Sequence, residues 1–274
     1  MFGRPRLLAS INALVVVAVV AWNYWAGARG LGGRTVGSMS DRYDTLFTPA
    51  GYAFSIWGLI FMGLLVNAGY QLWLAFRAPE VADDDALARH RATFFERLGP
   101  LLILTNLANG LWIVLWLTEQ TAASVVLLAA MFGLLTAAMW RLDMERWDAP
   151  LEVIALVWWP IVIYAGWVTV AVLANLSAWL AKHDVVSGDS APWAIAMIAI
   201  ATVYNLVMIA RRNLREHALV AVWALVAIAV EQWGHVASVQ WAAVVGAALL
   251  AVAVVVHAAR NRQTLPLVGR AFRD

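Results

Sequence analysis

Three stretches of this sequence place aromatic rings and amides along one face of an apolar helix. The positions within each stretch recur every three or four residues, which is the spacing that aligns side chains on one face of an α-helix. The three stripes are Phe54, Trp57 and Phe61; Asn106, Asn109 and Trp112; and Tyr164, Trp167, Ala171 and Asn175. None of these side chains is acidic or basic, and groups of that kind are what proton relays and ion-coupled transporters normally need. The stripes therefore predict either a wall for an apolar ligand or an interface between helices.

The spacing alone leaves both interpretations open. Asparagine side chains in membrane helices often hydrogen-bond across a helix interface, where such a bond is worth about 0.6–2 kcal/mol. Aromatic stripes at helical spacing usually pack against neighbouring helices. A ligand pocket needs the three stripes to face one common space, which depends on how the helices are arranged.

Patterns typical of catalytic and metal sites are missing from the sequence. There is no cysteine, no HExxH or GxSxG motif and no P-loop. The five histidines fall at predicted span ends or in loops, which argues against a haem held by a mid-membrane histidine but is compatible with free porphyrin. We interpret Glu231 as a residue at the membrane interface or as one paired with an arginine. We interpret the acidic run at 83–85, together with the basic residues at 89–91, as part of a solvated loop. We expect no metal and no cofactor other than a porphyrin bound as ligand.

Composition identifies the elements that must position these residues. The chain is 63% hydrophobic and 13% charged, far from the average soluble domain with about 25% charged residues. A window of about 20 residues, the length of a membrane-crossing helix, finds eight continuous apolar runs. We expect an all-α polytopic membrane bundle of about eight helices at 7–26, 50–76, 98–118, 122–140, 151–176, 192–210, 218–236 and 239–259.

The positive charges predict the orientation of the bundle. With these spans, fifteen Lys and Arg residues fall on one side and four on the other, so the positive-inside rule places both termini in the cytoplasm. The first run is interpreted as a span rather than a cleaved signal peptide, because it is longer than a typical signal core of about 7–15 residues. The net charge of +2 gives no reason to expect a nucleic-acid partner.

This topology also sets the depth of the stripes. Trp57, Asn109 and Trp167 each lie about 12–14 Å below the outer surface at 1.5 Å rise per residue. We therefore expect one shared pocket in the outer half of the bilayer, roofed by the outer loop at 26–48.

Four motifs resemble those of the TspO/MBR family of tryptophan-rich sensory proteins, which includes the mitochondrial translocator protein. They occur in the family's order and cover residues 7–180 as a five-helix unit. The motifs are Thr48-Pro49 followed by Phe54 and Trp57; Asn109 with Trp112; Ala137 to Trp140 with Leu142-Asp143; and Trp167-Val168 with Ala171 and Asn175 downstream of Pro160. The resemblance predicts a TspO-like core at 1–180, with 181–274 as a three-helix extension that has no counterpart in the five-helix family and ends in a short cytoplasmic tail.

The resemblance implies a pocket for porphyrins, other tetrapyrroles or sterol-like molecules. Carried over by position, the resemblance implies that Trp57 and Phe61 form aromatic walls and that Trp167 offers a stacking face. Asn109 would make a polar contact, and Asn175 would place an amide near the mouth of the pocket. Ala171 would be the small residue that leaves room for the ligand, and Tyr43 would be an aromatic residue of the lid. Two departures from the family pattern, Ala50 and Tyr52 after Pro49, imply a pocket of different shape.

The implied partners are membrane lipids, a hydrophobic small molecule and a second copy in a homodimer, and the implied location is a bacterial inner membrane. Two other functions stay open. The chain could transport small apolar molecules, although no clear inverted repeat is visible. It could also degrade porphyrin, with buried tryptophans supplying electrons.

Overall fold

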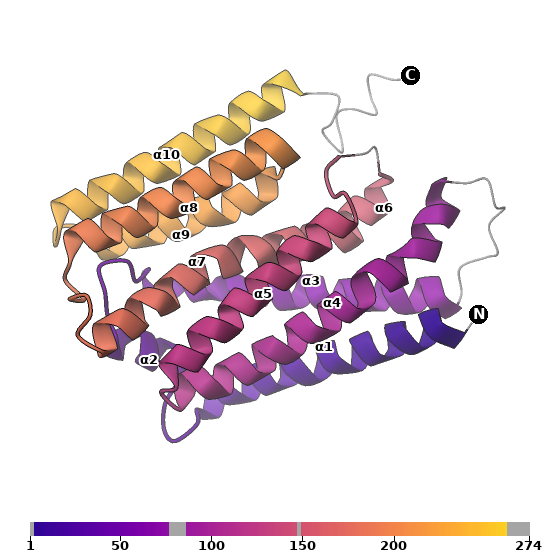
Figure 1. Cartoon of the computed structure of the whole chain (residues 1–274), viewed down its shortest axis with the longest axis horizontal. Coiled ribbons are helices and arrows are strands. Elements are labelled where there is room, and N and C mark those ends of the chain that lie inside the picture. The colour runs from indigo at the N-terminus through magenta and orange to yellow at the C-terminus, as the bar shows by residue number, and fades with distance from the viewer. Residues whose placement is uncertain (1–2, 77–85, 147–148, 262–274) are drawn as a thin grey trace.

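The computed structural model describes residues 3–76, 86–146 and 149–261, and this part of the chain is helical without a β-strand (Figure 1). The predicted all-α bundle is confirmed. The acidic run at 83–85, the side chains at 89–91 and the tail from 262 lie outside the described residues. The elements are α1 (Gly3–Arg29), α2 (Val36–Arg42), η1 (Gly51–Ser55), α3 (Ile56–Phe76), α4 (Ala86–Leu117), α5 (Thr121–Arg141), α6 (Leu151–Val153), η2 (Ile154–Trp158), α7 (Trp159–Lys182), α8 (Ala191–Arg212), α9 (Arg215–Glu231) and α10 (Ala237–Arg260).

Seven described helices are long and apolar enough to cross a membrane, whereas the sequence predicted about eight. The span expected at 218–236 folds instead as α9, which has 17 residues. At 1.5 Å per residue α9 is about 26 Å long, slightly less than the hydrocarbon core of about 30 Å. The helix ends earlier than the expected span, at Glu231, and Gly234 adopts a positive φ of 77° in the turn that follows. Helix α9 lies beside α8 and α10, so that α1 begins and α10 ends at the same end of the bundle (Figure 1).

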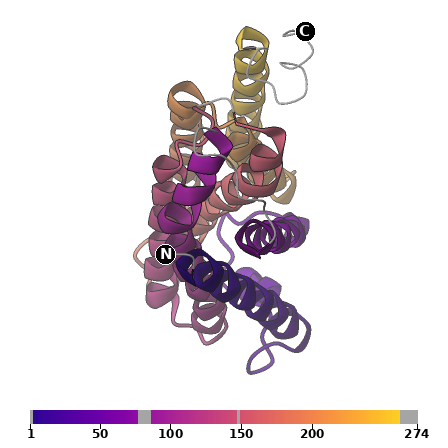
Figure 2. The same ribbon diagram turned by 90° about the vertical axis from the view of Figure 1, so that its right-hand side faces the viewer.

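Helix α7 lies at the centre of the bundle. It packs against α3 and α5 on one side and against α9 on the other, and it is the most buried of the candidate spans. Helices α8, α9 and α10 occupy one side of the molecule and α1 the opposite side (Figure 2). We call the end that carries α2 the outer end, following the side that the charge distribution predicts.

Pro160 explains an irregular turn at the start of α7. Proline has no backbone N–H to donate to the carbonyl four residues earlier, which belongs to Leu156 in the π-helical segment η2. The Asn67 side chain of α3 donates to that carbonyl at 2.8 Å, and Gln71 donates to Asn67 at 2.8 Å. A freed carbonyl in a membrane must find a partner inside the protein. These amides therefore tie α3 to the kink in α7.

Close helix contacts join α9 to α7 and α10 to α8. A Cβ on Gly166 of α7 would lie 2.8 Å from the His217 carbonyl of α9, and one on Gly246 of α10 would lie 2.7 Å from the Thr202 hydroxyl of α8. Small residues let membrane helices approach in this way. His217 was expected at a span end, and it does begin α9, but its side chain is fully buried and pairs with Asn205 of α8 at 2.7 Å.

Candidate ligand-binding site

Trp57 lies at the centre of an aromatic cluster built from three helices. Its ring stacks on Phe61 of the same helix at 5.3 Å between centroids and on Trp112 of α4 at 6.2 Å. Tyr164 and Trp167 of α7 meet it edge-on at 5.9 and 6.4 Å. The three sequence stripes therefore face one another. Aromatic pairs at these distances and angles have favourable geometry and rigidify the wall that they form.

Two cavities of different size lie on either side of this wall. The larger one has a volume of about 620 Å³ and lies among α1, α2, η1, α3 and α4. The smaller one has a volume of about 40 Å³ and is bounded by α2, η1, α3, α4 and α7. Residues common to both are Val36, Ser40, Thr48, Pro49, Phe54, Trp57 and Trp112. The two cavities therefore adjoin at these residues.

The larger cavity combines aromatic walls with an acidic rim. Tyr24, Phe54, Trp57, Phe61 and Trp112 supply the rings. Exposed carboxylates come from α2, from the loop after it and from the last residue of α9; these are Asp41, Asp44 and Glu231. A volume of about 300–1,000 Å³ is usual for cavities that bind small molecules.

The smaller cavity is lined by the residues of the α7 motif. Trp167, Ala171 and Asn175 face it together with Tyr43 and Trp116. Since one water occupies about 30 Å³ of the liquid, about 40 Å³ cannot hold a tetrapyrrole or a sterol. Ala171 was expected to leave room for a ligand, but the space beside it is almost filled by neighbouring side chains.

Asn175 makes the hydrogen bonds that the helix-interface interpretation predicts. Its carbonyl oxygen accepts from the Trp112 indole nitrogen at 3.2 Å and from the Ser124 hydroxyl. These donors belong to α4 and α5, so the amide of α7 joins three helices. Asn175 also borders the smaller cavity.

Three of the predicted contact residues line neither cavity. Asn109 accepts from the Asn23 side chain of α1 at 3.0 Å, Asn106 is fully buried, and Tyr164 is fully buried behind Trp57. Asn109 of the α4 stripe faces α1, and only Trp112 of this stripe lines both cavities. Asn109 thus works as a contact between helices, while Asn23 itself lines the larger cavity.

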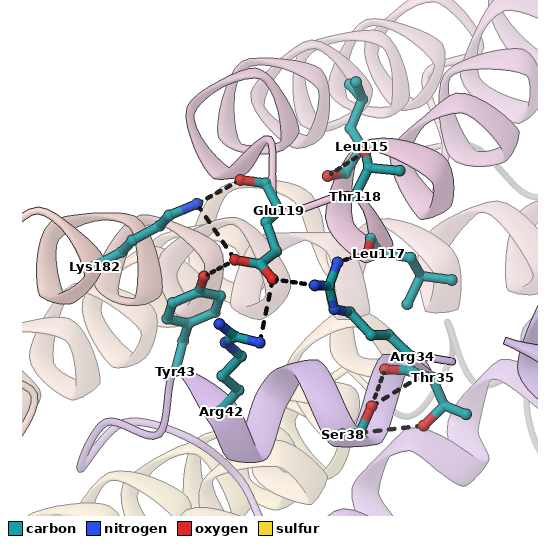
Figure 3. A network of polar contacts seen from close by, with 10 residues as sticks. All are labelled: Arg34, Thr35, Ser38, Arg42, Tyr43, Leu115, Leu117, Thr118, Glu119 and Lys182. Atoms are coloured by element: carbon teal, nitrogen blue, oxygen red, sulfur yellow. Dashed lines mark hydrogen bonds and ion pairs between the residues drawn. The ribbon is translucent and has the colours of Figure 1, made fainter. Parts of the chain in front are cut away.

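A single carboxylate, Glu119, joins basic and aromatic side chains of the outer loop to the ends of α4 and α7 (Figure 3). Glu119 lies in the turn between α4 and α5, and its side chain pairs with Arg34 at 2.8 Å and with Arg42 at 3.3 Å. The Tyr43 hydroxyl donates to it at 2.6 Å. Lys182 at the end of α7 donates to the Glu119 backbone carbonyl at 2.6 Å. We call these five residues the Glu119 clamp.

The clamp changes the proton affinity of its members. The hydrogen bond from Tyr43 and the charges of Arg34, Arg42 and Lys182 lower the pKa of Glu119, although partial burial opposes them. Burial and the hydrogen bond to Glu119 raise the pKa of Tyr43. Glu119 is therefore a carboxylate and Tyr43 a neutral phenol at neutral pH, as the hydrogen bond requires.

The C-terminal helices support the rim of the larger cavity. Ala50 donates its backbone N–H to the Ala227 carbonyl of α9 at 3.1 Å, and Trp223 donates to the Ala53 carbonyl of η1 at 3.2 Å. Tyr52 meets the Trp223 ring edge-on at 5.2 Å. Helix α9 also brings Glu231 to the cavity. Glu231 forms no pair with an arginine among the described residues, and it lies exposed at the end of α9.

Sequence reasoning missed the clamp and the acidic rim. A signal for the clamp existed, because Arg34, Arg42 and Lys182 are three of the four basic residues predicted on the outer side, and Glu119 lies in a short outer turn. The rim residues had no such signal, since they come from a loop and from the end of a distant helix.

Comparison with known proteins gives one match. A protein-family model described as TSPO-like protein matches residues 9–256. No curated protein and no solved structure matches the chain significantly. The match runs through α8, α9 and most of α10. The resemblance to the family that the motifs indicate over 7–180 therefore extends across the C-terminal helices.

Proposed function

The chain belongs to the family of TSPO-like proteins, and we propose that this membrane protein binds a flat, largely apolar ring molecule, such as a tetrapyrrole, in its larger cavity. The observation that carries the proposal is the cavity of about 620 Å³ walled by aromatic rings from α1, η1, α3 and α4. Among these rings Tyr24 is exposed and Phe54 is half-buried, so both can contact a planar ligand in the cavity.

The location of the cavity suggests how a ligand would reach it. Helix α2 and the loop after it contribute Gly37, Ser40 and Thr48 to its lining, so the cavity lies directly under the outer loop. With the fifteen-to-four distribution of basic residues, we propose that both termini face the cytoplasm of a bacterial cell and that the cavity opens toward the outer side of its inner membrane.

Quenching of intrinsic tryptophan fluorescence by protoporphyrin IX dimethyl ester tests the proposal. Wild-type protein in an uncharged detergent is expected to bind this neutral ring saturably. Gly58 lines the larger cavity, and a Cβ there meets nothing within 4 Å, so Gly58→Phe would place a ring in the ligand space. We expect affinity to fall about tenfold or more, equivalent to at least about 1.4 kcal/mol.

Gly69→Phe is the matched control. Gly69 lies on the same helix, a Cβ there also meets nothing within 4 Å, and it lines neither cavity. Its affinity should equal that of the wild type. Quenching that never saturates, or that is equal in Gly58→Phe and wild type, would show that the larger cavity is not the binding site.

A further inference from the structure

The larger cavity carries charge of only one sign. Its described lining residues include Asp41, Asp44 and Glu231 but no lysine, arginine or histidine. Within the described part of the chain, none of these carboxylates forms an ion pair. A cleft with walls of low dielectric constant focuses the field of such charges on whatever enters it.

Nearby positive charges are held elsewhere. Arg34, Arg42 and Lys182 all gather on Glu119, on the side of the smaller cavity. Arg29 ends α1 next to Ala28 of the cavity wall, but it is exposed and is not itself a lining residue. The Glu119 clamp therefore separates charge across the outer end, with cations on one side and uncompensated carboxylates on the other.

The aromatic side chains behind the rim of the larger cavity can contact an organic cation as well as a planar apolar ring. Tyr24 packs against Phe61 at 6.2 Å, and Phe54 and Trp57 are only half buried beside them. An organic cation over the face of such a ring is attracted by the ring quadrupole, and Trp gives the strongest attraction. Carboxylates at the mouth and aromatic faces behind them attract the same kind of group from two directions.

We propose that the larger cavity selects ring molecules that carry a positive charge, such as an aromatic amine or another organic cation, over those that carry carboxylates. The inference rests on the proposed function, since it names the charge of the ligand for the same cavity. Partial burial and the like charge of Asp41 raise the pKa of Asp44, although hydrogen bonds from Thr48 and Thr45 oppose this shift. A ligand with propionate groups would instead bring like charges to the rim, which is unfavourable within a Debye length of about 8 Å at physiological salt.

Three porphyrins with the same ring and different side-chain charge test the inference. Protoporphyrin IX carries two carboxylates, its dimethyl ester is neutral, and its bis(2-aminoethyl) amide carries two ammonium groups. We expect the amide to bind wild-type protein about tenfold more tightly than the ester, and protoporphyrin IX to bind most weakly. Raising the salt concentration should narrow the differences, because salt screens charges at an exposed rim.

Variants test whether the three rim carboxylates cause the preference for positively charged porphyrins. In the triple variant Asp41→Asn, Asp44→Asn, Glu231→Gln, affinity for the amide should fall about tenfold while affinity for the neutral ester stays unchanged. Asp184→Asn is the control, because Asp184 is an exposed outer-side carboxylate that lines neither cavity and has a left-handed φ of 55° that asparagine tolerates. This control variant should bind the three porphyrins with the same affinities, and in the same order of affinity, as the wild type.

The possible outcomes separate the two proposals. Equal binding of the three porphyrins, or tightest binding of protoporphyrin IX, would overturn the charge inference and leave the binding function intact. The same holds if the triple variant keeps the wild-type preference for the amide. If no porphyrin binds saturably, the proposed function fails and the charge inference fails with it.

Discussion

The two cavities share an aromatic wall, yet they differ in size, in charge and in what surrounds them. The smaller cavity, of about 40 Å³, lies between well-packed helices and under the Glu119 clamp. The larger one, of about 620 Å³, has three carboxylates on its rim and no basic lining residue in the described part of the chain. The α7 motif residues surround the smaller cavity. The comparison teaches that residues expected from a motif to line a ligand pocket can lie in a closely packed region between helices.

Removal of the shared wall should have the largest effect. Trp57→Ala would delete a ring that contacts four other rings and would join the two cavities. Tryptophan-to-alanine changes in cores cost about 3–5 kcal/mol, and the half-buried Trp57 belongs at the lower end. We expect a lower unfolding temperature in detergent and loss of saturable binding of the porphyrin ester.

Two further variants show whether that effect comes from the wall. Trp57→Phe should keep most of the stability and the binding, because a smaller ring still separates the cavities. Trp241→Ala removes an exposed tryptophan of α10 and should change neither measurement. Wild-type affinity in Trp57→Ala would mean that the wall has no part in ligand binding.

Filling the smaller cavity should affect stability more than binding. Ala171→Phe inserts a ring where only about 40 Å³ is free, and overpacking of this kind costs about 1–3 kcal/mol. The unfolding temperature should fall, while affinity for the porphyrin ester should stay within about twofold of wild type, a change of less than about 0.5 kcal/mol. Gly58→Phe should give the opposite pattern. If folded Ala171→Phe loses binding and Gly58→Phe keeps it, the ligand occupies the smaller cavity and the comparison is reversed.

The architecture of this chain could be predicted well because a membrane imposes its own pattern. Continuous apolar runs of about 20 residues predicted seven of the candidate spans, since backbone polar groups in hydrocarbon must be paired within a helix. The end of α9 was misplaced because hydropathy does not register the positive φ at Gly234. The irregular turn before Pro160 and its partner Asn67 also required the arrangement of helices, since they lie far apart in the sequence.

The site could be predicted only in part, for a similar reason. Helical spacing correctly grouped Trp57, Trp112 and Trp167 on facing surfaces. It could not say that α4 turns Asn109 toward α1, because rotation of a helix about its axis depends on its neighbours. Helical spacing also could not predict that Glu231 lines the larger cavity, because Glu231 reaches this position through the packing of α9 against η1.

The Glu119 clamp gives the smallest effect, and its sign follows from the pKa of Glu119. Hydrogen bonding from Tyr43 and three basic neighbours lower that pKa below the ordinary value of 4.5. A carboxylate with a lowered pKa stabilises the folded state at pH above its unfolded value, and this contribution is lost as pH falls through the folded value. Wild type should therefore unfold at a slightly higher temperature than Glu119→Gln at pH 7, and the difference should shrink toward zero in acid below about pH 4.5.

The same variant sharpens the contrast between the cavities. Tyr43 lines only the smaller cavity, so loosening the clamp at neutral pH should leave affinity for the porphyrin ester in the larger cavity nearly unchanged. Asp184→Asn provides the matched control and should unfold like wild type at neutral and acidic pH, because the Asp184 side chain forms no ion pair among the described residues. A difference between wild type and Glu119→Gln that grows in acid would contradict the lowered pKa. A large loss of ester affinity in Glu119→Gln would show instead that the clamp holds the roof of both cavities, because α2 contributes Val36 and Ser40 to each.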